Sequence, residues 1–341
     1  MTPVNVTFWD STMCSEWLAP CLPPSDYILK MRDGIRRPIN VYTDNFIKSE
    51  LVDIPVDGNK NVCILLEPYC TPPWTDVYDY IQTDFEKFDL VITHNKDKLG
   101  HLLEERPDKF YYSSKCAYTT WLDEANIKLH PKSKMISCPF SWKHYCLGHR
   151  LRHAVYNSLN DTGLVDFYGS GAMWNKNQTI TGREHHPHED PCGGVLTLGS
   201  EESQRDTLCE FRTAYYDYKY VIIIENAYEQ TGFNSEKLYD CFLSGCVPIY
   251  CGSKIFDDNI NMDGIVEFNM RGVELPDPDC PVEEFHQRVL CNKLKDIVDF
   301  LNKEDPYEKM LPAIEHNFNY AKTFMRGEDS WYRIFKDLKF L

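Results

Sequence analysis

The feature that most constrains the fold is a series of short apolar runs separated by polar, turn-rich or helical stretches. Eight runs have the length of a strand: residues 4–8, 62–66, 90–93, 134–137, 164–168, 220–224, 247–250 and 265–268. Strands that alternate with helices form parallel sheets covered by those helices, so the pattern predicts an α/β fold. We assign the first four runs to an N-terminal half and the last four to a C-terminal half.

The length of the chain predicts two domains, because 341 residues exceed what one hydrophobic core usually serves. We expect two Rossmann-like domains that face each other across a cleft, the first spanning residues 1–147 and the second residues 148–320. Residues 321–341 would form a C-terminal helix or tail. Apolar residues at helical intervals from Leu311 to Ala321 also predict a helix. We expect this C-terminal part of the chain to cross back and pack against both halves.

Charge, hydropathy and cysteine content narrow the class of protein. The chain has 36 Lys and Arg against 52 Asp and Glu, and a net charge of −16 would repel the phosphates of a nucleic acid. No signal-peptide pattern opens the sequence, and the apolar runs are too short to span a membrane. The 14 cysteines are scattered without paired metal spacing. We therefore expect reduced thiols in a soluble, cytoplasmic protein. The alternative is a shortened form of a membrane-anchored enzyme.

The helix that follows the run 220–224 predicts an anion site at its start. Ser235 can cap this helix, whose N-terminus offers free backbone N–H groups, and Gly245 ends it. Lys237 in the first turn is unfavourable beside the positive end of the helix dipole unless an anion binds there. Glu236 could accept hydrogen bonds from ribose hydroxyls. The alternative is a solvated Glu–Lys pair on an ordinary amphipathic helix.

Three parts of this segment resemble the signature of glycosyltransferase family 10, the α-1,3-fucosyltransferases: EN at 225–226, FNSEK at 233–237 and GCVPIYCG at 245–252. Upstream, GHRLRHAVYNSLN at 148–160 is similar to the family's Arg-bearing helix, and VDFYG at 165–169 to the strand after it. The resemblance, which covers about half of the chain, implies a GT-B-like fold in a soluble enzyme like the bacterial or viral members. It also implies inverting transfer of L-fucose from GDP-β-L-fucose to a hydroxyl of a glycan or glycoprotein acceptor.

Carried over by position, the resemblance implies that Arg152 and Lys237 bind the diphosphate of the donor. The other donor-binding residues that it implies are Glu236 at the ribose, Asn226 near the diphosphate, Phe233 at an aromatic position, and Ser235, Glu225, Tyr168 and Gly169. This sequence departs from the family in a slightly longer loop between Asn226 and Glu236, and in Trp142, which replaces a small polar residue. Arg152 also lies off the apolar stripe of its own helix; the alternative is a plain surface arginine.

The chemistry of transfer requires a base near the acceptor. Two cations at the diphosphate would neutralise it, so we expect neither a metal nor a cofactor. Transfer with inversion also needs a carboxylate or histidine that takes the proton of the acceptor hydroxyl. We choose Glu67, which follows the run 62–66 and resembles the family's catalytic glutamate in position. The alternatives are Asp10, Asp76 and His94.

Tyr69 and Trp74 follow Glu67 and could stack on an acceptor sugar, although a packed loop of aromatic residues would explain them equally well. We discount two metal-like patterns: the proline-interrupted cluster His185, His186, His188 and Cys192, and the Asp277-Pro278-Asp279 turn. Two other functions stay open. One is a transferase of the same fold that uses another sugar nucleotide, and the other is a non-catalytic nucleotide- or carbohydrate-binding protein.

Overall fold

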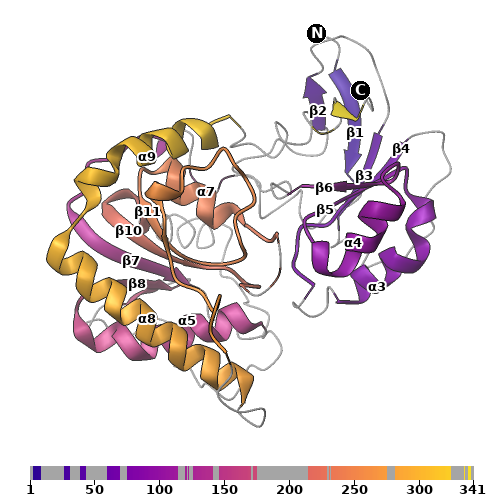
Figure 1. The fold of residues 1–341 in the computed structure, drawn as a ribbon. Coiled ribbons are helices and arrows are strands. Elements are labelled where there is room, and N and C mark those ends of the chain that lie inside the picture. The colour runs from indigo at the N-terminus through magenta and orange to yellow at the C-terminus, as the bar shows by residue number, and fades with distance from the viewer. Residues whose placement is uncertain are drawn as a thin grey trace.

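The chain forms two six-stranded sheets, each packed against helices, in the two lobes of Figure 1. The structure is a computed structural model. It describes residues 3–8, 27–30, 39–43, 60–69, 75–113, 120, 122, 126–140, 146–169, 172–174, 214–228, 230, 232–274, 281–323, 334, 337 and 338. These residues form both sheets and the helices packed against them.

The N-terminal sheet has the strand order β2-β1-β3-β4-β5-β6. Its strands are β1 (Pro3–Phe8), β2 (Tyr27–Lys30), β3 (Ile39–Thr43), β4 (Lys60–Ile64), β5 (Leu90–Thr93) and β6 (Phe110–Tyr112). The edge strand β2 is antiparallel to β1, and the other described pairs are parallel. Two helices join β4, β5 and β6 and lie together on one face of the sheet (Figure 1): α3 (Thr75–Asp84) and α4 (Lys96–Glu105).

The C-terminal sheet has the strand order β12-β11-β10-β7-β8-β9. Its strands are β7 (Lys134–Phe140), β8 (Asp166–Gly169), β9 (Ala172–Trp174), β10 (Tyr218–Ile224), β11 (Val247–Cys251) and β12 (Val266–Glu267). Only the pair β8–β9 is antiparallel among the described pairs of this sheet. The chain runs from β7 outward to β8 and then returns to build β10, β11 and β12 on the other side. The direction of winding therefore reverses between β7 and β10.

Helices cover both faces of the C-terminal sheet: α5 (Leu147–Leu159), α7 (Glu236–Leu243), α8 (Val282–Glu304) and α9 (Tyr307–Ala321). Both faces of strand β10 are therefore buried. Ile222 and Ile224 pack in the core that contains α5 and α8, whereas Val221 and Ile223 pack in the core that contains α7. Because both faces are buried, the strand reads as a continuous apolar run rather than an alternating one.

The carboxyl ends of the two sheets face each other. Phe233, in the loop after β10, packs against His94, which follows β5, with ring centroids 5.0 Å apart. Asn95 Nδ2 in the N-terminal lobe donates to Gln230 Oε1 in the C-terminal lobe at 3.4 Å. The predicted α/β architecture of two facing domains with mainly parallel sheets is confirmed, and it is the arrangement of a GT-B-like fold.

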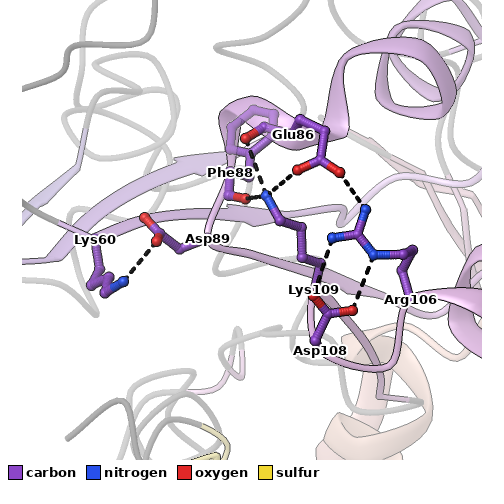
Figure 2. Close-up of polar contacts among 7 residues, drawn as sticks. All are labelled: Lys60, Glu86, Phe88, Asp89, Arg106, Asp108 and Lys109. Atoms are coloured by element: carbon purple, nitrogen blue, oxygen red, sulfur yellow. Dashed lines mark hydrogen bonds and ion pairs between the residues drawn. The ribbon is translucent and has the colours of Figure 1, made fainter.

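An ion-pair cluster lies at the opposite, amino end of the N-terminal sheet (Figure 2). It contains Lys60, Glu86, Phe88, Asp89, Arg106, Asp108 and Lys109. Lys109 Nζ lies 2.7 Å from a Glu86 oxygen, and Arg106 pairs with both Glu86 and Asp108. Each of these cations has a carboxylate partner near the surface, where such pairs contribute little to stability. Through these contacts, the segment before β6 binds to the segment before β5.

All eight predicted strands occur, as β1, β4, β5, β7, β8, β10, β11 and β12. One assignment is wrong: the run 134–137 belongs to the C-terminal sheet, where β7 pairs with β10 and β8. The C-terminal sheet therefore begins before residue 148. The reason is that a doubly wound sheet starts from a central strand, here β7, so the first strand of the C-terminal sheet precedes helix α5.

The helical pattern from Leu311 to Ala321 lies in α9, where Ile314, Phe318 and Ala321 are buried, so this helix ends where the predicted C-terminal segment of residues 321–341 begins. Most of residues 324–341 lie outside the described part of the chain, so the crossing back of the tail stays a prediction. Among the described helices, none has the length and apolarity needed to cross a membrane. Seven of the cysteines are described, and all seven carry free thiols.

Candidate functional site

The reversal between β7 and β10 brings together several of the residues predicted to bind the donor. In open α/β sheets, ligands bind beyond the carboxyl ends of the strands at such a switch point. Helix α5 follows β7, and the polar residues Glu225 and Asn226 follow β10 directly. Helix α7 begins after the loop that follows β10. The end of β10 also contacts the start of α5, where Gly148 N donates to Asn226 O.

Arg152 lies in the second turn of α5 and is buried, with 3% of its surface exposed. Its Nε donates to Ile224 O at 2.9 Å, and its Nη2 donates to Asn226 Oδ1 at 2.8 Å. Both acceptors are neutral, and no described carboxylate forms an ion pair with this guanidinium. Because a buried charge without a counter-ion is costly, the arrangement fits a site for an anion.

Gly148 allows the start of α5 to approach the end of β10. A Cβ atom at this position would lie 1.8 Å from Glu225 O and 2.9 Å from Asn226 Cα. The Gly148 N–H also donates to Asn226 O at 3.1 Å. Sequence reasoning did not select this residue; its only signal is a glycine in the first turn of a helix, where alanine is the better helix former.

Glu225 is completely buried and contacts Ser235, the N-cap of α7. Its Oε1 accepts from Ser235 N at 2.8 Å, and its Oε2 accepts from Ser235 Oγ at 2.6 Å. Burial raises the pKa of the Glu225 carboxyl, while the nearby Lys237 ammonium and the hydrogen bonds from Ser235 oppose that shift. Glu225 was predicted to bind the donor, but both of its oxygens face the helix cap.

Lys237 and Glu236 open helix α7. Lys237 Nζ lies 2.9 Å from Glu236 Oε1 and 3.1 Å from Ser235 Oγ, and the two charged side chains keep 23% and 12% of their surfaces exposed. Burial lowers the pKa of the Lys237 ammonium, but Glu236 and Glu225 outweigh it, so the pKa is higher than usual. The predicted Ser235 cap is confirmed, because its side chain accepts from Lys237 N.

Arg152 and Lys237 lie close enough to influence each other electrostatically, since the Arg152 charge acts to lower the pKa of Lys237. Charges from both lobes affect the pKa of the thiol of Cys146, the N-cap residue of α5. Burial raises the pKa of its thiol, Arg152 acts to lower it and Glu67 acts to raise it. Glu67 of the N-terminal lobe therefore lies near Cys146, at the start of α5. Sequence reasoning did not select Cys146, whose Sγ lies 3.0 Å from His149 Nδ1.

The candidate bases differ in exposure. Glu67 is half-buried, and its backbone oxygen accepts from Tyr78 Oη at 2.9 Å. His94 is 1% exposed, and burial lowers its pKa to about 4. Asp76 is exposed in the first turn of α3, and Asp10 lies outside the described residues. Among the described candidates, Glu67 is thus the half-buried carboxylate, and it lies near Cys146 at the start of α5.

Two of the remaining predicted donor residues, Tyr168 and Phe233, are buried. Tyr168 is 6% exposed and its hydroxyl lies 2.7 Å from that of Tyr218. Gly169 ends β8, and Phe233 is 1% exposed against His94. On the acceptor side, the Lys98 ammonium lies 3.7 Å from the centroid of the Tyr69 ring.

Some of the predicted positions cannot be placed. Trp74, Trp142, the histidine cluster of residues 185–192 and the turn of residues 277–279 all lie outside the described residues. Within the part of the chain that is described, no group of three His, Cys, Asp or Glu side chains could hold a metal ion.

No protein-family model matches the chain, and no curated protein matches it. Solved structures similar to it include the pneumococcal O-GlcNAc transferase GtfA with UDP and GlcNAc, at 14% identity over 88% of this chain, with a TM-score of 0.45. The chain spans 57% of the length of GtfA. An α1,3-fucosyltransferase with GDP is 13% identical over 95% of this chain and 91% of that one, with a TM-score of 0.42.

Proposed function

We propose that the chain is a glycosyltransferase that uses a sugar nucleotide as its donor. The observation that carries the proposal is the buried Arg152 guanidinium, which has no carboxylate partner among the described residues and lies at the switch point near the Lys237 ammonium. A diphosphate would supply the missing counter-charge to both cations. Glu236 adjoins Lys237 and could accept hydrogen bonds from a ribose.

The two cations would also contribute to the chemistry. As the bond between the sugar and the diphosphate breaks, negative charge grows on the departing diphosphate, and fixed cations stabilise that charge. Glu67, which lies near Cys146 at the start of α5, would take the proton of the acceptor hydroxyl, so that transfer inverts the anomeric centre. We expect no metal to be required. The resemblance to family 10 in residues 225–252 favours GDP-fucose as donor and a glycan as acceptor.

The test is release of free nucleotide from a panel of GDP- and UDP-sugars, with and without glycan acceptors. We expect GDP release that depends on GDP-fucose and an acceptor and that survives EDTA. Lys237→Gln should lower kcat/KM by about 10²-fold, in the range seen when one donor to a developing oxyanion is removed. Lys303→Gln, in an exposed part of α8, is the matched control.

Three outcomes separate the alternatives. Release from a different sugar nucleotide keeps the transferase and changes the donor. Tight nucleotide binding without turnover indicates a non-catalytic binding protein. The proposal is wrong if no nucleoside diphosphate binds more tightly than its nucleoside and Lys237→Gln leaves kcat/KM unchanged.

A further inference from the structure

The three residues at the end of β10 connect to both cations of the proposed donor site. Ile224 O and Asn226 Oδ1 accept hydrogen bonds from Arg152. Between them, Glu225 contacts Ser235 rather than Arg152. The backbone of the same segment is anchored on its other side, because Glu225 N donates to Cys251 O of β11 at 2.9 Å. One short segment is therefore a common support for two helices.

The direction of the hydrogen bonds at Ser235 is set by Glu225. A hydroxyl group has one proton to donate and two lone pairs to accept with. Because the Ser235 hydroxyl donates to Glu225 Oε2 at 2.6 Å, its lone pairs are left for other donors. Lys237 Nζ, at 3.1 Å from the same oxygen, is such a donor. The carboxylate thus makes Ser235 an acceptor for the ammonium.

We infer that Glu225 is a positioning residue for donor binding: it does not touch the donor, and it acts through Ser235 to hold the Lys237 ammonium in place. The inference rests on the proposed function and assigns Glu225 an indirect role in place of the direct contact expected from sequence. The geometry supports it, because Glu225 is 0% exposed and both of its oxygens are used by Ser235.

The charge of Glu225 has a second effect on Lys237. The charged groups that act on this ammonium are Glu236, Glu225 and Arg152; both carboxylates raise its pKa, and Arg152 lowers it. Removing the charge of Glu225 therefore lowers the pKa of Lys237. A purely structural role for Glu225 would not change the pH dependence of diphosphate binding, whereas a role through Lys237 would.

Glu225→Gln is the decisive variant. A glutamine has one acceptor oxygen where Glu225 uses two, so its amide N–H₂ must face either Ser235 N or Ser235 Oγ. Titration calorimetry with GDP and with guanosine separates loss of diphosphate contacts from loss of nucleoside contacts. We expect the Kd for GDP at pH 7 to rise about tenfold, equal to about 1.4 kcal/mol, with the Kd for guanosine unchanged.

The pH series isolates Lys237. We expect the ratio of the GDP Kd of Glu225→Gln to that of the wild type to grow between pH 7.5 and pH 9.5, because Lys237 loses its proton earlier in the variant. Adding Lys237→Arg should make the ratio flat, since a guanidinium stays protonated throughout this range. Glu283→Gln is the matched control, because this carboxylate pairs with Arg150 of α5 at the surface and has no bond to Ser235 or Lys237 among the described residues.

Ser235→Ala provides a second route if Glu225→Gln does not fold. This variant keeps the carboxylate and removes the relaying hydroxyl, so GDP should bind more weakly while guanosine binding is retained. The inference is overturned if the wild type prefers GDP to guanosine but Glu225→Gln, or in its place Ser235→Ala, binds GDP within twofold of the wild type. Failure of the wild type itself to prefer GDP would instead refute the proposed function.

Discussion

Gly148→Ala tests whether α5 and the end of β10 need their close approach. The new Cβ would meet Glu225 O at 1.8 Å, Glu225 C at 2.8 Å and Asn226 Cα at 2.9 Å. All three are backbone atoms, which cannot rotate away as a flexible side chain could. Overpacking typically costs about 1–3 kcal/mol, and we expect the upper end here. The higher helix propensity of alanine returns at most about 1 kcal/mol.

The net loss of about 2 kcal/mol corresponds to a fall in the melting temperature of roughly 4–8 °C. Moving α5 away from Ile224 O should also displace the Arg152 guanidinium, so the Kd for GDP should rise by about tenfold or more. Thermal unfolding followed by circular dichroism and calorimetric titration with GDP measure the two effects on the same sample.

Gly100→Ala is the matched control. Gly100 lies within α4, and no atom that would meet a new Cβ lies within 4 Å of it. This variant should be more stable than the wild type by about 0.5–1 kcal/mol, because alanine loses less backbone entropy in a helix. If Gly148→Ala behaves like Gly100→Ala and binds GDP normally, the close approach does not exist and the argument that Arg152 is held by β10 fails.

Two further outcomes follow from the N-terminal lobe. Glu67→Gln should lower kcat by 10²-fold or more while leaving the Kd for GDP unchanged, since a general base contributes about 10²–10⁴-fold; near-normal turnover would transfer the role to another group. For His94, burial lowers the pKa from 6.5 to about 4, so the unfolded chain binds the proton first and the stability of the folded state falls as the pH drops from 6.5 towards 4. At about 1.4 kcal/mol per pH unit, the loss of stability approaches roughly 3 kcal/mol. Denaturant titrations should therefore show that the free energy of unfolding depends less on pH in His94→Gln than in the wild type. Equal pH dependence in the two proteins would show that His94 is not buried as a neutral imidazole.

The sequence predicts strands most clearly where both faces of the strand are buried. Strands β10 and β11 are buried along almost their whole length, so each leaves an unbroken apolar run. The four strands that were not predicted lack this signal. Strands β2, β6 and β9 have three or four residues and lie at the edges of their sheets, where half of the hydrogen-bonding capacity is open. Strand β3 is central, but Asn40 and Thr43 interrupt its apolar pattern.

The site shows the limit of periodicity more clearly. The stripe of Leu151, Val155 and Leu159 correctly identifies the core face of α5, and Arg152 is off that stripe. On a helix lying flat on a sheet, such a residue would be exposed, yet Arg152 is 3% exposed. It is covered because the end of β10 folds over the start of α5. That contact joins residues 72 positions apart in the sequence, and no local pattern encodes it.

Three arrangements at the switch point are each unfavourable alone. Lys237 and Arg152 lie in the first two turns of their helices, near the positive ends of the helix dipoles. Arg152 is buried among neutral acceptors, and Glu225 is a fully buried carboxylate. Proteins accept such local costs mainly where function requires them. A bound diphosphate would relieve the first two, because it places negative charge beside both cations. It would leave the third, since the oxygens of Glu225 face Ser235, and this difference is why we regard Glu225 as a support for the cations rather than as part of the donor contact.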